Sequence, residues 1–122
     1  MASELRVNTL KAASGNNSVA TSFVAGGSAK QWAKFTVAAA LNDSLNTSSI
    51  TDSGTGDFEV IFSSAMGNAN YAVTTCTFTT AGRETHCDAS STSAYGISTW
   101  YNMSRSEDTI TGCGTEALGD LA

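Results

Sequence analysis

Six residues combine charge or flat aromatic rings in one neighbourhood of the sequence. These candidate receptor-binding residues are Arg83, Glu84, His86, Asp88, Trp100 and Tyr101. Guanidinium and imidazole groups can hydrogen-bond to sugar hydroxyls or acidic groups, and a flat ring can stack on a sugar ring. Residues 81–93 are predicted to be a polar loop, and loops on a rigid β scaffold often carry binding function. The alternative is a solvated hairpin tip beside aromatic residues that belong to the core.

The sequence predicts no catalytic residues, and we expect that the protein is not an enzyme. His86 is the single histidine, and Asp88 lies two residues away. A Ser-His-Asp triad also needs a nucleophile on a strained turn, and the chain contains no Gly-x-Ser-x-Gly motif. Gly26 and Gly27 lack the lysine spacing of a phosphate-binding loop.

No metal or cofactor is expected. Asp52 and Asp57 flank a Gly- and Ser-rich segment whose spacing does not match a calcium loop, so an ordinary turn is favoured over bound calcium. Cys76, Cys87 and Cys113 fit no zinc pattern. Free thiols are expected, with a Cys76–Cys87 disulfide across a hairpin as the alternative.

The charge balance argues against a nucleic-acid partner. The net charge is −5, and the six basic residues are scattered along the chain, whereas phosphate binding requires clustered Lys and Arg. No apolar run has the length of a membrane span, and the opening MASELR turns polar at once, unlike a signal peptide. We therefore expect no membrane insertion, and synthesis and folding in the cytoplasm.

The composition favours one all-β domain, or a small domain with an extended arm. Apolar residues make up 41% of the chain and charged residues only 14%, and Ser, Thr, Asn and 11 Gly take much of the rest, with no Pro. The β-branched and aromatic residues recur in short alternating bursts, as in strands. Because a core built from this much apolar surface is thin, oligomerisation is a natural supplement.

Residues 50–77 are predicted to organise the fold as a strand, a turn, a second strand, a loop and a third strand. Phe58, Val60 and Phe62 occupy alternate positions, which places three large apolar groups on one face of the second strand. Residues 52–57 supply the Asp, Ser and Gly that a tight turn requires.

Further strands are predicted around this hairpin. In the strand that begins at Lys30, Trp32 and Phe35 lie on opposite faces, so both faces are expected to be packed. The other predicted strands cover residues 45–50, 70–80, 95–101 and 109–113. The tail after residue 115 is weakly specified.

Residues 1–29 are predicted to form an N-terminal arm, and residues 30–122 a β-sandwich-like knob. The arm contains expected strands at 3–10 and 19–24 but too few apolar groups for a core of its own. Leu5 and Val7 form a short apolar stripe, which we expect to add a strand to a sheet edge on another subunit or protein.

Three segments give the chain a resemblance to a known family. SELRVNTL opens the chain, AKQWAKF follows, and the block LNTSSITDSGTGDFEVIFSSAMGNANYAV completes a match over about residues 3–73. These segments are similar to the virion fibre proteins of tailed bacteriophages. The match is specific in its central thirty residues, whereas residues 82–108 carry no motif that aligns with the family.

The resemblance implies a structural tail-fibre or capsid-fibre subunit that assembles as a homotrimer in the host cytoplasm and is located on the virion. The arm would join other virion proteins, and the C-terminal loops would meet a host-surface glycan or protein. The alternative from another class is a carbohydrate-binding module without enzymatic activity, with Trp100 and Tyr101 as its stacking platform. A hydrolase subunit that acts on host polysaccharide is a third and weaker reading, because depolymerising spikes need a longer chain.

Overall fold

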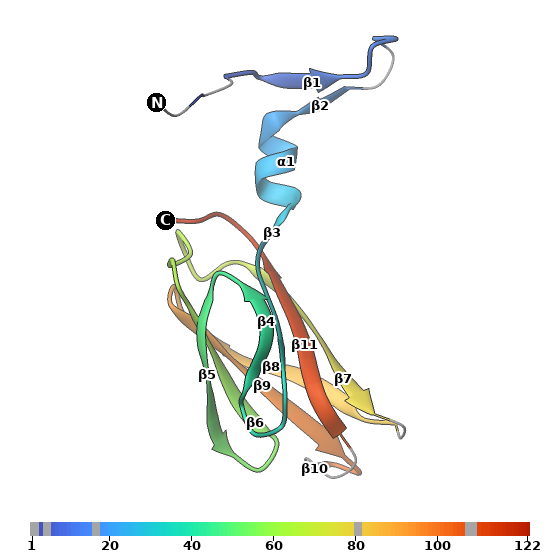
Figure 1. Cartoon of the computed structure of the whole chain (residues 1–122), viewed down its shortest axis with the longest axis vertical. Coiled ribbons are helices and arrows are strands. Elements are labelled where there is room, and N and C mark those ends of the chain that lie inside the picture. Colours follow the sequence, from blue (N-terminus) through green and yellow to red (C-terminus); the bar gives the residue numbers. More distant parts are fainter. Residues whose placement is uncertain (1–2, 4–5, 16–17, 80–81, 107–109) are drawn as a thin grey trace.

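The computed structural model describes residues 3, 6–15, 18–79, 82–106 and 110–122 (Figure 1). Most of the described chain forms antiparallel strands, which confirms the all-β prediction. Two larger sheets face each other, and a small hairpin with a short helix precedes them (Figure 1). No helix in the described part of the chain is long and apolar enough to cross a membrane.

The N-terminal segment differs from the predicted strands. Strand β1 (Thr9–Lys11) pairs with β2 (Ser18–Ala20), and helix α1 (Thr21–Gly27) follows at once. The predicted strand at 3–10 is wrong at residues 6–8, because the pairing with β2 begins only at Thr9. The predicted strand at 19–24 is also wrong beyond residue 20, because the backbone turns helical there.

The four-stranded sheet has the order β4-β3-β11-β7. Its members are β3 (Ala29–Phe35), β4 (Leu41–Leu45), β7 (Ala72–Thr79) and β11 (Ile110–Leu118). Strand β11 pairs with β3 on one side and with β7 on the other, so it is a central strand. The expectation of a last strand that ends at residue 113 before a weakly specified tail is therefore wrong.

The five-stranded sheet has β9 (Ala94–Tyr101) at its centre. Strand β6 (Asp57–Phe62) and strand β8 (Glu84–Ser90) both pair with β9, and β5 (Thr47–Gly54) pairs with β6. A two-residue strand, β10 (Ser104–Arg105), pairs with the end of β9. The loop predicted at 81–93 is a strand over 84–90, because this segment pairs with the outer edge of β9.

The core lies between the two sheets. Phe58 and Val60 are 0% exposed and Phe62 is 6% exposed, as the alternation along this segment predicts. The ring centroids of Phe35 in β3 and Phe58 in β6 are 5.3 Å apart in an edge-to-face arrangement, so aromatic packing joins the sheets. Tyr95, in the segment predicted as a strand at 95–101, is only 1% exposed and belongs to the core.

The turn between β5 and β6 depends on Gly56. Its φ is +66°, and a Cβ atom there would lie 2.8 Å from the Thr99 carbonyl oxygen and the Ser106 nitrogen. The Thr99 N–H donates a 2.8 Å hydrogen bond to the Gly56 carbonyl. Only a residue without a side chain fits this close approach, so Gly56 fixes the start of β6 against the end of β9.

Candidate functional site

The candidate site lies on the outer face of the five-stranded sheet. In β9, Ser98 is paired with His86 of β8 on one side and with Asp57 of β6 on the other. Two residues later, Trp100 is paired with Glu84 of β8 and Arg105 of β10. Because directly paired residues of neighbouring strands project to the same face, these side chains form two adjacent rows of three.

A chain of polar contacts holds the Trp100 ring in position. The Trp100 Nε1–H donates to Ser98 Oγ at 2.7 Å, and Ser98 Oγ donates to Asp88 Oδ1 at 3.0 Å. The other Asp88 oxygen, Oδ2, accepts from Arg105 Nη2 at 3.1 Å, and Arg105 also forms an ion pair with Asp57. Side chains from β6, β8, β9 and β10 therefore fix the indole through contacts that link them to one another.

Two further groups lie against the indole. The His86 and Trp100 ring centroids are 5.7 Å apart, with the rings close to perpendicular, and the Arg105 guanidinium carbon is 5.7 Å from the indole centroid. His86 Nε2 lies 3.6 Å from Glu84 Oε2. Because the His86 and Glu84 side chains are 53% and 78% exposed, they remain accessible to a ligand.

Arg83 and Tyr101 lie on the opposite side of the sheet. Successive strand residues alternate between faces, so Tyr101 shares the inward side with Thr99 but extends past the end of the core, where it is 47% exposed. The Arg83 guanidinium carbon stacks 4.0 Å from the centroid of the Tyr101 ring. A cation over an aromatic face at this distance is a favourable contact.

A hollow of about 310 Å³ at the end of the sheet is lined by side chains from both of its faces. Its lining residues are Gly82, Arg83, Glu84, Trp100, Tyr101 and Asn102. Four of the six predicted receptor-binding residues therefore line one hollow, and His86 and Asp88 lie beside it on the outer face. Asp57, Ser98 and Arg105, which hold Trp100 and Asp88, are not among the predicted site residues. Because charge is scarce in this chain, Asp57 and Arg105 could have been singled out, whereas nothing in the sequence marks Ser98.

The contacts of Ser98 and Asp88 and the surroundings of Cys87 define the chemistry that the site offers. The Ser98 hydroxyl donates directly to the Asp88 carboxylate instead of to an imidazole, so this serine and aspartate do not have the order of contacts of a catalytic triad. Burial, and next the negative charge of Asp88, raise the pKa of the Cys87 thiol, which disfavours the reactive thiolate. Among the described residues, no group of three or more His, Cys, Asp or Glu side chains is placed to hold a metal ion.

The predicted attachment residues are only partly described. Leu5 lies outside the described residues, and Val7 is 39% exposed and precedes β1. The Val7 carbonyl accepts a 3.1 Å hydrogen bond from Thr21 Oγ1, which ties the start of α1 back to the hairpin. The role of Leu5 and Val7 in attachment stays a prediction.

The site lies at the end of the two-sheet body that is remote from α1. Strand β9 ends there, β6 and β8 begin there, and β10 occupies this end in Figure 1, whereas α1 joins β3 at the other end. We call this end of the body, with Trp100, Tyr101 and Arg105, the distal end. The chain matches no family model, no curated protein and no solved structure.

Proposed function

We propose that this protein is a structural virion appendage, a tail-fibre or capsid-fibre subunit of a tailed bacteriophage that assembles as a homotrimer. Residues 1–29 act as the arm that joins other virion proteins, and residues 30–122 act as the knob. The distal end of the knob meets the host surface. The similarity of residues 3–73 to the segments of virion fibre proteins supports this reading.

One structural observation carries the proposal. Between residues 6 and 28, none of the described residues is buried, although this segment contains a hairpin and a helix. Phe23 is 75% exposed and Leu10 is 45% exposed. A seven-residue helix is too short to be stable by itself in water, so partners outside this chain are expected to order the segment.

The position of the candidate site supports separate roles for the N-terminal segment and the distal end. An appendage needs one end that joins the particle and a remote end that meets the receptor. The N-terminal segment and the distal end lie at opposite ends of the chain's longest axis (Figure 1). The distal end also concentrates exposed charged and aromatic side chains, which suit recognition of a polar surface.

Deletion of residues 1–12 tests the attachment role. Because the described residues in this stretch bury nothing, the truncated protein should remain soluble and keep its thermal unfolding midpoint. It should no longer be incorporated into particles, whereas the full-length Glu59→Ser control should be incorporated normally. Incorporation of the truncated protein at normal copy number would refute attachment through the arm.

A carbohydrate-binding module without virion attachment is the second candidate. The observation in its favour is the hollow beside Trp100, where a fixed indole, Arg83 and Glu84 offer stacking and hydrogen bonding together. A glycan array with the purified full-length chain tests this candidate. Specific glycan binding by a chain that is absent from purified particles would favour the module over the appendage.

A further inference from the structure

The outer face of the four-stranded sheet is chemically unlike the candidate site. One row of paired residues crosses it from Leu45 through Trp32 and Glu116 to Thr74. A second row crosses from Asp43 through Lys34 and Gly114 to Cys76, and Phe78 lies next to it on β7. We call this surface, made by the outward side chains of the two rows and Phe78, the Trp32 face.

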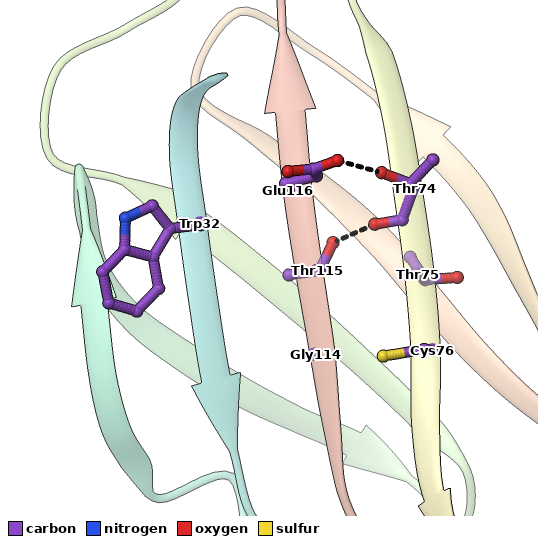
Figure 2. A pocket seen from close by; sticks show the side chains of 7 residues that line it. All are labelled: Trp32, Thr74, Thr75, Cys76, Gly114, Thr115 and Glu116. Carbon is purple, nitrogen blue, oxygen red and sulfur yellow. Dashed lines mark hydrogen bonds between the residues drawn. The ribbon is translucent and has the colours of Figure 1, made fainter. Parts of the chain in front are cut away.

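A groove of about 280 Å³ runs along the centre of the Trp32 face. Its lining residues are Trp32, Thr74, Thr75, Cys76, Gly114, Thr115 and Glu116, and Figure 2 shows the indole on one side and the β7 side chains on the other. Gly114 forms the floor: a Cβ atom there would lie 3.1 Å from Cys76 Sγ and 3.4 Å from the Phe78 ring. The Thr74 hydroxyl donates a 3.0 Å hydrogen bond to Glu116 Oε1 at one end of the groove.

Large apolar side chains of the Trp32 face remain partly exposed in the single chain. Trp32 is 38% exposed, Phe78 is 40% exposed and Leu45 is 49% exposed. The prediction that both faces of β3 are packed therefore holds within the chain only for the Phe35 face, since Phe35 is 0% exposed. Exposed apolar groups that gather on one sheet face, opposite a charged face, are typical of an interaction surface.

The occupant that best fits this surface is a second copy of the same chain. Lys34 lies on the face with two carboxylates, Asp43 and Glu116, so both signs of charge border the apolar centre. A surface with this composition can pair its cation with a carboxylate of an identical surface, which gives electrostatic complementarity without another partner.

The N-terminal segment gives a second reason for choosing another copy. Only Ser28 separates α1 from β3, the strand that carries Trp32. The exposed apolar side chains of α1, Phe23 and Val24, are thus linked directly to the Trp32 face. A second copy that covers this face would therefore lie close to the segment that joins β3 to α1 (Figure 1).

We infer that the Trp32 face is the surface through which copies of this chain associate. The inference rests on the assembly of several copies in the proposed function and assigns the residues that form the contact. In the assembly, Trp32, Leu45 and Phe78 are covered, Lys34 faces a carboxylate of the neighbouring copy, and the candidate site around Trp100 stays accessible.

Charge insertion on the Trp32 face tests this assignment. Trp32→Glu and, separately, Leu45→Glu should convert the wild-type oligomer into a 12.5 kDa monomer in sedimentation equilibrium at micromolar concentration. Both positions are exposed in the single chain, so the far-ultraviolet circular dichroism spectrum should be unchanged. The matched control is Met103→Glu, which places the same charge at a 93% exposed apolar residue of the distal end and should leave the oligomer intact.

The cysteines provide a second readout that does not depend on mass. Cys76 lines the groove, whereas Cys87 lies on β8 of the other sheet, and both are exposed in the single chain. Alkylation by iodoacetamide, followed by peptide mass spectrometry, should show that Trp32→Glu speeds modification of Cys76 at least tenfold and leaves the rate at Cys87 unchanged. Each thiol is compared with itself in the variant and the wild type, because the two thiols have different surroundings.

The outcomes separate this inference from the proposed function. An oligomer that persists in both Glu variants, with Cys76 modified as fast in the wild type as in the variants, would overturn the Trp32 face as the interface and leave the appendage proposal standing. A wild-type chain that is monomeric at micromolar concentration would overturn both the inference and the homotrimer.

Discussion

The hydroxyl of Tyr95 donates a 2.8 Å hydrogen bond to Oε1 of Gln31 across the interior of the protein. Tyr95 belongs to β9 of the five-stranded sheet and Gln31 to β3 of the four-stranded sheet, and both side chains are buried. Thr115 Oγ1 lies 2.8 Å from the same Tyr95 oxygen, and Gln31 Nε2 donates to Thr47 Oγ1 at 3.0 Å. A network of buried side chains, each with a hydrogen-bond partner, therefore joins the two sheets in addition to the aromatic core.

Removal of the Tyr95 hydroxyl should destabilise the fold. In Tyr95→Phe the buried Gln31 Oε1 loses its donor, and leaving a buried polar group unsatisfied costs about 1–3 kcal/mol. Urea unfolding monitored by fluorescence measures this loss. The control is Tyr71→Phe, whose hydroxyl donates to the Ser91 carbonyl in a more exposed setting; it should cost less. Equal stability of Tyr95→Phe and the wild type would contradict the network's role.

Stability should fall at alkaline pH because of the same residue. Burial raises the pKa of Tyr95 above its ordinary value of 10.0, so the folded protein keeps a proton that the unfolded chain releases. The contribution of neutral Tyr95 to the free energy of unfolding is complete below about pH 10. Above that pH it decreases by up to about 1.4 kcal/mol per pH unit. Urea unfolding between pH 8 and 11 should show this decline. In Tyr95→Phe the decline should be shallower; an identical slope would mean that another group dominates.

Because alternate residues of β6 are buried, truncation of neighbouring side chains should lower the free energy of unfolding by unequal amounts. Phe58 is 0% exposed and packs against Phe35, so Phe58→Ala should cost about 3–5 kcal/mol, enough to unfold a marginal domain. Ile61 is half-buried on the opposite face, and Ile61→Ser should cost much less. Thermal unfolding of both variants provides the comparison. If the two losses are equal, Ile61 is covered by a contact outside the single chain.

Substitution of exposed residues of the candidate site should leave the stability of the fold unchanged. Glu84 and His86 are largely exposed, so the double variant Glu84→Ser/His86→Ser should keep its melting temperature, since surface substitutions usually stay within about 0.5 kcal/mol each. Asp88 is left unchanged because it binds Ser98 and Arg105.

Adsorption of particles to host cells should fall sharply in this double variant. Glu59→Ser changes an exposed residue of the same sheet and serves as the control. Normal adsorption with an intact fold would place the receptor site elsewhere or remove this protein from host contact.

Local patterns predicted the elements whose side chains alternate clearly. Strands β6 and β9 follow directly from large apolar residues at every second position, such as Phe58 and Val60, or Tyr95 and Ile97. These side chains carry enough apolar area to fix one face of a strand in the core, so the short-range pattern and the tertiary structure agree. Strand β5 lacks this alternation and continues to Gly54, into residues predicted as a turn.

Elements with weak local signals could not be predicted because long-range pairing forms them. Strand β11 was predicted only as far as residue 113, because Gly112 and Gly114 disfavour strands locally, yet it continues to Leu118 between β3 and β7. Strand β8 has small or polar side chains, and its pairing with β9 makes it a strand. Helix α1 carries Phe23 and Val24, which favour strands, but it pairs with none of the described strands.

Most residues of the candidate site could be predicted from the sequence, but their positions relative to one another could not. Scarce charge pointed to Arg83 and His86, but the sequence could not show that they face opposite sides of a sheet. Arg105 joins the site through ion pairs with Asp57 and Asp88, which are far away in the sequence, and through its pairing with Trp100. Contacts of this kind depend on the register of three strands, which no local pattern specifies.

A cryo-EM map of the phage particle assembled with this chain tests the proposed function most directly. The map should contain three copies of the two-sheet body in each appendage, with their N-terminal segments at the particle, the Trp32 faces toward one another and the Trp100 end outward. Particles without this density would contradict the account. So would copies oriented with Trp100 against the particle and the N-terminal segment in solvent.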